Sequence, residues 1–193
     1  MKRAVDLVIA LPALAVLGPL LLLLAAAVRL GSRGPALYAA RRVGRAGDEF
    51  TMYKLRTMYA DRGGAAITGR DDPRVTPLGR VLRRMHLDEL PQLWNIVRGE
   101  MSLVGPRPED PQFVSHYSPE QRAVLGVRPG LTGPAQLAHR DESRRLPAHD
   151  TDAVYELDVL PGKLAIDLEY VRHHSLAGDL RILWRTIGDA LSR

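Results

Sequence analysis

The first 33 residues carry the longest apolar stretch of the chain. Between Ala4 and Val28 the one charged residue is Asp6. As a helix, about 25 such residues would be roughly 37 Å long, more than the ~30 Å hydrocarbon core of a bilayer. The stretch is too long for a cleaved signal peptide, and Arg29 and Arg33 follow it where small residues would mark a cleavage site. The pattern therefore predicts a membrane helix.

Two features of this stretch favour a re-entrant helix over a transmembrane span. Gly18 and Pro19 stand near its middle, where proline removes a backbone hydrogen bond and kinks a helix. Cations flank both ends, and such flanks stay on the cytoplasmic side. They are Lys2, Arg3, Arg29, Arg33, Arg41 and Arg42. We therefore expect a helix–break–helix over residues 1–33 with both ends cytoplasmic, and Asp6 paired one turn away with Lys2 or Arg3. A kinked span remains the alternative.

After residue 33 the pattern changes to short strands and amphipathic helices. Residues 37–43 and 49–56 have strand composition on either side of a GRAGD turn, which predicts a β-hairpin. Residues 78–87 predict a basic amphipathic helix, either solvated or lying on anionic lipid. Its apolar face holds Leu78, Val81, Leu82 and Met85, and its polar face holds Arg80, Arg83 and Arg84.

Further helices are expected from Pro91 onward, within 109–125 and at the C-terminal end. The last helix has Leu176, Leu180, Leu183, Trp184, Ile187 and Leu191 at helical spacing, which indicates a core or an interfacial helix, with the core as the default. Residues 60–79 predict a mobile loop, 128–137 a turn-rich connector and 139–152 another loop.

Together these elements predict a mainly helical α+β fold. A re-entrant membrane helix over 1–33 would precede a cytoplasmic-face catalytic domain over 34–193, in which amphipathic helices lie at the membrane interface around the core.

Composition narrows the classes of function. The 193 residues include 27 Lys and Arg against 22 Asp and Glu, which favours anionic partners such as nucleotides, nucleic acid or lipid headgroups. The absence of Cys excludes disulfides and thiolate zinc sites. Aromatic residues make up only 5%, so few rings are available for stacking on nucleic acid bases. A membrane-anchored nucleic-acid-binding module is therefore a weaker alternative, and we expect no nucleic acid partner.

The segment HLDELPQLWNIVRGEMSLVGPRP carries the candidate chemistry. Asp88 and Glu89 are adjacent just before Pro91, which is favoured in a first helical turn. The pair therefore sits at or just ahead of a helix N-terminus, where negative charge is favoured. Taken alone, ordinary acidic capping explains the pair.

The surrounding cations change this interpretation. Lys54 and Arg56 stand two residues apart at a strand end and so are expected on one face. Arg107 is held between Pro106 and Pro108, and a guanidinium restricted in this way suits a phosphate. Each cation taken alone fits an ordinary surface charge. Together with two carboxylates beside a membrane helix, they indicate phosphoryl chemistry with magnesium, which prefers oxygen ligands.

At this point the sequence resembles a known family. The motifs KRAVDL, GPALY, YKLRTM, TPLGRVLRRMHLDELPQLWNIVRGEMSLVGPRPE, RPGLTGPAQL and DLEYVRHHSLAGDLRIL occur in this order over nearly the whole chain. They resemble the bacterial sugar transferases, in particular the small monotopic phosphoglycosyl transferases. Larger relatives carry an extra multi-spanning region, so the chain is similar to the minimal form.

The resemblance implies transfer of a phospho-sugar from a UDP-sugar to a polyprenol phosphate, usually undecaprenyl phosphate, with release of UMP. It implies Asp88 as the nucleophile that forms an aspartyl phospho-sugar intermediate. It implies that Glu89 assists the lipid phosphate or helps to hold Mg²⁺, with Asp88 and Glu89 as the metal ligands. The expected location is the cytoplasmic face of the bacterial inner membrane.

The chain departs from the family pattern at two positions. Gly18-Pro19 replaces the frequent Ser-Pro, so the kink is kept but a hydroxyl-to-backbone bond is lost. His86 stands where Ser or Thr is common, which bears on local substrate geometry. A membrane-bound nucleotide-sugar hydrolase that uses the same two carboxylates, with water as the acceptor, remains an alternative.

Overall fold

The computed structural model describes residues 1–69, 72–140, 146 and 150–191, with the backbone alone for 190–191. Most of the loop expected over 139–152, residues 70–71 and the side chain of Leu191 lie outside the described residues. The elements in chain order are α1 (Lys2–Gly31), β1 (Leu37–Val43), η1 (Arg45–Gly47), β2 (Glu49–Leu55), α2 (Pro77–Arg84), η2 (Leu87–Glu89), α3 (Gln92–Arg98), β3 (Ser102–Val104), α4 (Pro111–Val114), η3 (Gln121–Gly126), β4 (Gly130–Thr132), α5 (Pro134–Ala138), α7 (Thr151–Val154), η4 (Tyr155–Val159), α8 (Leu160–His173) and α9 (Leu176–Leu191).

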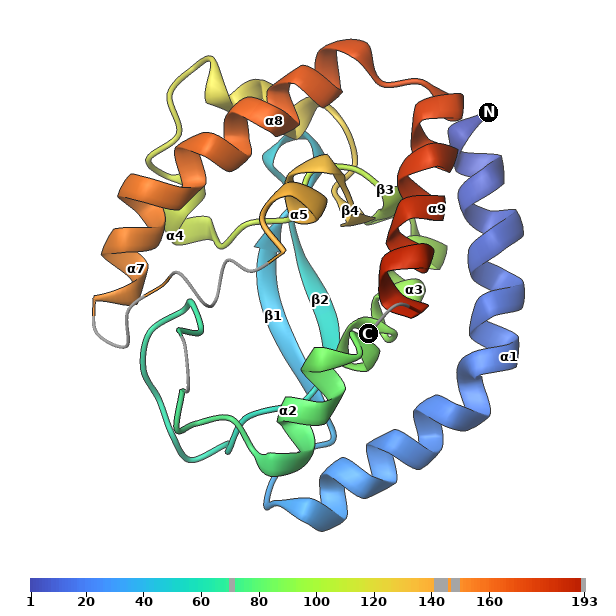
Figure 1. The fold of residues 1–193 in the computed structure, drawn as a ribbon, viewed down its shortest axis with the longest axis vertical. Helices are drawn as coiled ribbons and strands as arrows, with labels where there is room; N and C mark the ends of the chain where they lie inside the picture. The colour runs from blue at the N-terminus through green and yellow to red at the C-terminus, as the bar shows by residue number, and fades with distance from the viewer. Residues whose placement is uncertain (70–71, 141–145, 147–149, 192–193) are drawn as a thin grey trace.

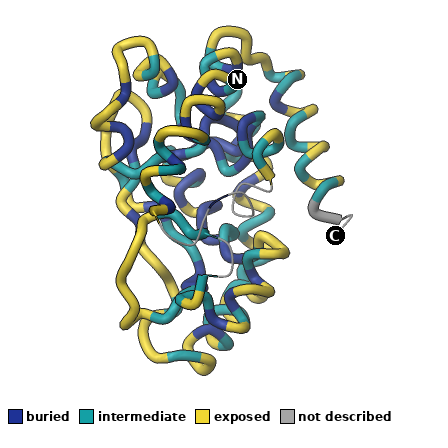
Figure 2. The backbone as a smooth tube through the Cα atoms, turned by 60° about the vertical axis from the view of Figure 1, so that its left-hand side comes forward, coloured by how far each residue is buried: buried dark blue, intermediate teal, exposed yellow. Residues whose placement is uncertain are grey.

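The described part of the chain is mainly helical around a short hairpin, as predicted. Figure 1 shows β1 and β2 at the centre, α8 across one end, and α1 wrapped along the opposite side. Buried residues gather on the inner sides of these elements, and the outer loops are exposed (Figure 2). The largest cluster packs Ala10 of α1 against Leu93 and Ile96 of α3 and against Met52 of β2. The apolar N-terminal helix is therefore part of the same core as the hairpin.

The break predicted at Gly18-Pro19 is wrong, because α1 is one continuous helix that contains both Pro12 and Pro19. Each proline removes a single backbone donor, and the hydrogen bonds on either side hold the helix together. Figure 1 shows that α1 bends around the domain instead of running straight. The helix is long and apolar enough to cross a membrane.

The pairing predicted for Asp6 is also wrong. Its carboxylate is 3% exposed and accepts hydrogen bonds from the Ser102 hydroxyl (3.0 Å) and the Leu103 N–H (3.1 Å). Lys2 instead forms an ion pair with Asp179 at the start of α9. Arg3 donates to backbone carbonyls at the end of α3. Since these partners are far away in the sequence, local spacing could not identify them.

The hairpin matches its prediction. β1 and β2 pair antiparallel from Leu37 opposite Leu55 to Val43 opposite Glu49, with residues 44–48 as the turn. The predicted connector over 128–137 instead contributes β4, which pairs parallel to β3, and then α5. A Cβ on Gly130 would lie 2.1 Å from the Gly105 nitrogen, so glycine is required for this close pairing.

Three predicted helices differ from expectation, either in their extent or in the side that they expose. The helix predicted over 78–87 ends at Arg84, and Val81 and Met85 of its expected inner face are more than half exposed. Residues 109–125 form only α4 and η3, with the start at Ser118-Pro119-Glu120 confirmed by the Ser118 and Gln121 side chains, which each accept from the other's N–H. The default core role of α9 is wrong for Trp184, whose exposure is 74%.

Candidate active site

The carboxylates of interest lie in a short turn between two helices. α2 ends at Arg84, and His86 then takes a left-handed conformation (φ 55°, ψ 19°) that reverses the chain. Asp88 and Glu89 lie in the single turn η2, and Pro91 leads into α3. The prediction that the pair stands just ahead of a helix N-terminus is therefore confirmed.

Glu89 is held by two cations from distant parts of the chain. Its Oε1 atom accepts from Lys54 Nζ at 2.9 Å and from an Arg107 guanidinium nitrogen at 2.6 Å. Burial by itself raises the pKa of Glu89, but the charges and hydrogen bonds of Arg107 and Lys54 outweigh it and hold the pKa well below its usual range. Glu89 is thus a fixed negative charge between two positive ones.

The carboxylate of Asp88 has a different environment from that of Glu89. Asp88 is 7% exposed, and within the described residues no hydrogen bond to its carboxylate is found. Burial and the neighbouring charge of Glu89 raise the pKa of Asp88, although Lys54, Arg83 and Arg107 oppose the shift. A buried carboxylate without hydrogen-bond donors keeps its lone pairs available. The two carboxylates therefore differ: the charge of Glu89 is paired with two cations, whereas the Asp88 oxygens are available to react with a substrate.

The backbone that leads to Arg107 is held in place by β4. The Gly105 N–H donates to the Thr132 carbonyl (2.9 Å), and the Gly130 N–H donates to the Pro106 carbonyl (2.8 Å), so β4 clamps the chain before Arg107. Pro106 and Pro108 are both buried. The two prolines restrict the backbone on either side of Arg107, and its guanidinium contacts Glu89.

The structure does not bring Arg56 to the pair of carboxylates. β2 ends at Leu55, so the alternation that would place Arg56 on the same face as Lys54 stops one residue too early. The Arg56 guanidinium turns to the end of α1 and donates to backbone carbonyls and one hydroxyl. The acceptors are the carbonyls of Val28, Ser32, Arg33, Gly34 and Pro35 and the Ser32 hydroxyl. Arg56 closes the C-terminal end of α1, whose carbonyls lack helical partners.

A broad cleft lies over the carboxylates. Its walls are one face of the hairpin, the loop over 57–68, and a polar group that sequence reasoning missed, namely Arg83, Glu109, Tyr155 and Lys163. The loop is irregular, as predicted, and the Ala66 and Ile67 N–H groups tether it to the Asp152 carboxylate. Arg83 donates to the Thr57 hydroxyl instead of facing solvent. Helical periodicity gave no signal for these contacts, because they depend on how distant elements pack.

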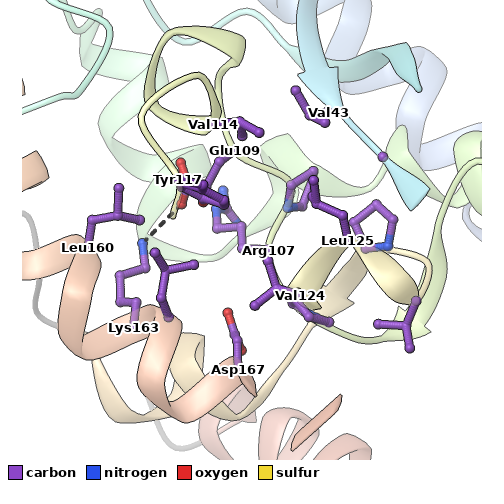
Figure 3. Close-up of a pocket in the computed structure, with 16 residues that line it drawn as sticks. Val43, Arg107, Glu109, Val114, Tyr117, Val124, Leu125, Leu160, Lys163 and Asp167 are labelled. Carbon is purple, nitrogen blue, oxygen red and sulfur yellow. Dashed lines mark ion pairs between the residues drawn. The ribbon is translucent and has the colours of Figure 1, made fainter. Parts of the chain in front are cut away.

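A smaller cavity lies behind Arg107, as Figure 3 shows. There Lys163 of α8 forms an ion pair with Glu109 at 3.6 Å and donates to the Tyr155 hydroxyl at 2.8 Å. Burial raises the pKa of Asp167, at the same cavity, to about 7. This network joins α8 to the segment that carries Arg107.

The described residues hold no cluster of three or more His, Cys, Asp or Glu side chains that could bind a metal by itself. Asp88 and Glu89 nevertheless fit a magnesium ion, because Mg²⁺ is commonly held by one or two carboxylates and completed by substrate phosphates and water. Asp88 has oxygen lone pairs free of hydrogen bonds from the described residues, whereas Oε1 of Glu89 is already shared by two cations.

Comparison with known proteins identifies one family and several relatives of this chain. The bacterial sugar transferase family matches residues 1–193. The chain is 42% identical to UDP-glucose:undecaprenyl-phosphate glucose-1-phosphate transferase of Caulobacter vibrioides, covering 99% of this chain and 70% of that protein. It is 42% identical to undecaprenyl-phosphate glucose phosphotransferase of Komagataeibacter xylinus, but spans only 35% of that protein.

An N-acetylgalactosaminephosphotransferase of Aeromonas hydrophila that is named for UDP-N-acetylgalactosamine and undecaprenyl phosphate is 35% identical, over 99% of this chain and 44% of that protein. These relatives differ in the sugar they are named for. The match over residues 1–193 shows that the chain belongs to the bacterial sugar transferase family.

Proposed function

We propose that the protein transfers a sugar phosphate from a UDP-sugar to undecaprenyl phosphate or a related polyprenol phosphate, and releases UMP. The observation that carries this proposal is the different state of the two carboxylates. Asp88 lines the cleft, and no hydrogen bond from the described residues reaches its carboxylate, while the charge of the Glu89 carboxylate is paired with Lys54 and Arg107. The names of the relatives support the substrate classes.

In the first step, an Asp88 oxygen attacks the β-phosphorus of the UDP-sugar. The new bond joins aspartate to phosphorus, and the bond between the β-phosphorus and the bridging oxygen breaks, so UMP leaves with that oxygen. In the second step, an oxygen of the polyprenol phosphate attacks the same phosphorus and displaces Asp88. The products are a polyprenyl diphosphate sugar and the regenerated carboxylate.

In this proposal, Lys54 and Arg107 bind the phosphates of the UDP-sugar. Both donate to the same oxygen of Glu89, so a diphosphate bound beside the pair would meet two positive charges that are already oriented. Arg107 supplies a planar fork, which matches two phosphate oxygens, whereas Lys54 supplies a single point charge. Magnesium held by Asp88 and Glu89 would neutralise part of the phosphate charge.

The reaction is proposed to take place at the cytoplasmic face of the inner membrane. Both ends of α1 contact the same domain. Near its start, Lys2, Arg3 and Asp6 bind residues of the domain, and at its end Arg56 of the domain binds the carbonyls of α1. A helix whose two ends hold the same domain returns to the side from which it entered. This supports a re-entrant α1 and brings the polyprenol phosphate to the cleft at the interface.

The test measures UMP release from a panel of UDP-sugars with and without undecaprenyl phosphate. Turnover that requires the lipid, with a polyprenyl diphosphate sugar as product, is the expected result. Lipid-independent release of UMP and free sugar phosphate would instead identify a hydrolase. The panel also identifies the sugar, on which the relatives differ.

A further inference from the structure

A third carboxylate in the cleft has an oxygen that the described residues do not use. Glu109 lines the same cleft as Asp88 and Arg107, and its side chain is 13% exposed. Its Oε1 atom accepts from the Tyr155 hydroxyl at 2.5 Å and lies 3.6 Å from Lys163 Nζ (Figure 3). Both contacts involve this one oxygen, and no hydrogen bond from the described residues reaches Oε2. The Glu109 carboxylate is therefore held in place and can still accept a hydrogen bond from a ligand.

The backbone of Glu109 is held in place as well. The Val43 N–H at the end of β1 donates to the Glu109 carbonyl at 3.0 Å. The next acidic residue, Asp110, is used by the fold, because it accepts from the Gln112 N–H at the start of α4 and forms an ion pair with Arg42. Asp110 does not line the cleft. Of these two adjacent carboxylates, Glu109 is therefore the one placed to meet a substrate.

Stability alone is a weak reason for this charged group. The side chains of Lys163 and Glu109 are only 6% and 13% exposed. Moving two charges out of water costs about as much free energy as their attraction returns, so apolar side chains of the same volume would join α8 to this segment equally well. A charged pair that is kept at the wall of a cleft therefore indicates a binding role.

The charges along the cleft indicate which part of a UDP-sugar meets Glu109. Lys54 and Arg107 suit the diphosphate, whereas the Glu109 carboxylate would repel a phosphate and attract hydroxyl groups. Glu109 follows Arg107 by two residues, a span of at most about 7 Å. In a UDP-sugar, the sugar is joined directly to the β-phosphate, whereas the ribose is separated from it by the α-phosphate. The hydroxyls nearest to Glu109 are therefore those of the sugar.

We propose that Glu109 is a specificity-determining residue, which accepts a hydrogen bond from a hydroxyl group of the transferred sugar. Tyr155 and Lys163 are positioning residues that hold its other oxygen. This inference rests on the proposed function and extends it, because it names the group that distinguishes one sugar from another. A donor without the contacted hydroxyl would leave a largely buried carboxylate oxygen unpaired, and such a loss gives strong discrimination.

Donors that lack single hydroxyl groups test the proposal. They are the monodeoxy analogues of the UDP-sugar that the chain turns over fastest. In the unchanged chain, loss of the contacted hydroxyl should lower kcat/KM by about ten- to a hundredfold. Glu109→Gln offers one side-chain oxygen instead of two, so it should lower kcat/KM for the complete donor by a similar factor, and the same analogue should then lose little more. If every analogue lost as much in Glu109→Gln as in the unchanged chain, the proposal would be wrong.

Two further variants separate this role from a structural one. Glu109→Asp keeps a negative charge near Lys163 but shortens the side chain, so it should fold normally, as thermal unfolding would show, and still lose the discrimination. Glu100→Gln is the matched control, because Glu100 is 21% exposed and paired with Arg98 but lies outside the cleft. It should discriminate between the analogues as the unchanged chain does. Full discrimination in Glu109→Asp would contradict the proposal, and so would its loss in Glu100→Gln.

UDP, which has the ribose but no sugar, separates the two sources of hydroxyl groups. As a competitive inhibitor, it should bind Glu109→Gln as tightly as the unchanged chain, and an inhibition constant raised tenfold would assign Glu109 to the ribose and overturn the proposal. If the unchanged chain turned over no UDP-sugar, the proposed function would fail. Calorimetric titration would then decide on Glu109, because Glu109→Gln should weaken binding of UDP-glucose or UDP-N-acetylgalactosamine but not of UDP. Unchanged affinity for both UDP-sugars would refute the assignment.

Discussion

At the scale of single residues, Asp88 and Glu89 are adjacent carboxylates with opposite environments. Asp88→Asn keeps the shape of the side chain but removes the nucleophile, so turnover should fall by more than about a thousandfold. Steady-state UMP release measures this, with the helical circular dichroism spectrum as the check on folding. Asp158→Asn, an exposed aspartate in η4, is the matched control and should retain full activity. Substantial residual activity in Asp88→Asn would remove the nucleophile assignment.

Arg83 allows a second test at this scale, through the pKa of Asp88. Burial raises that pKa, and the charge of Arg83 lowers it, so Arg83→Gln should raise it further. The nucleophile must be ionised, and the acid limb of the pH profile of kcat/KM should therefore move to higher pH in Arg83→Gln. Arg83→Lys keeps the charge and should keep the limb in place. An unmoved limb in Arg83→Gln would show that another group controls it.

Arg107 gives a third test. Arg107→Lys keeps the positive charge but loses the planar fork, so kcat/KM for the UDP-sugar should fall clearly, by roughly tenfold or more. Because lysine keeps a positive charge beside Glu89, the change should have little effect on the free energy of unfolding. Kinetics equal to those of the unchanged chain would make Arg107 an ordinary surface cation.

At the scale of elements, the sequence predicted what local patterns control. Strand composition on either side of a Gly-containing turn was sufficient to predict the hairpin, and Pro91 marks the turn that carries Asp88. The pairing of β3 with β4 was not predicted, because each strand has three residues and their register depends on glycines that approach across the sheet. Arg83 and Lys163 were missed because their partners come from other elements.

The role of Arg56 could not be predicted from its local sequence, because its partners lie at the end of α1. Arg56 is 6% exposed, and its side chain donates hydrogen bonds to the last turn of α1 and to the loop that follows it. Arg56→Gln should therefore destabilise the fold by about 3 kcal/mol, since several buried carbonyls lose a charged donor. Thermal unfolding in detergent measures this. A phosphate-binding role predicts a different outcome, a raised KM for the UDP-sugar with unchanged stability.

At the scale of the whole molecule, α1 is both the helix that we propose to enter the membrane and part of the core. Asp6 links it to the strand that leads to Arg107, and Arg56 links its end to the hairpin that carries Lys54. The two ends of α1 thus support the two cations that hold Glu89. If α1 inserts into the membrane as proposed, its insertion is coupled to the geometry of the site through these contacts, and replacing α1 with an unrelated anchor would remove both supports.

The same contacts determine the topology we predict. A helix of 30 residues could cross a bilayer, but crossing would separate Lys2 and Arg3 from the domain that they contact. Each of these cations would then leave a carboxylate or backbone carbonyls unpaired, at a cost of several kcal/mol. Returning to the cytoplasmic face keeps all of these bonds and agrees with the positive charge at both ends.

Cysteine labelling tests this directly, since the chain has no cysteine. Ala4→Cys reports on the start of α1 and Arg45→Cys on the hairpin turn, and both positions are exposed. In vesicles of defined orientation, a membrane-impermeant maleimide should label both variants when the cytoplasmic face is outward and neither when it is inward. If Ala4→Cys reacts from the periplasmic face while Arg45→Cys reacts from the cytoplasmic face, α1 spans the membrane. The ion pair between Lys2 and Asp179 could not then exist in the bilayer.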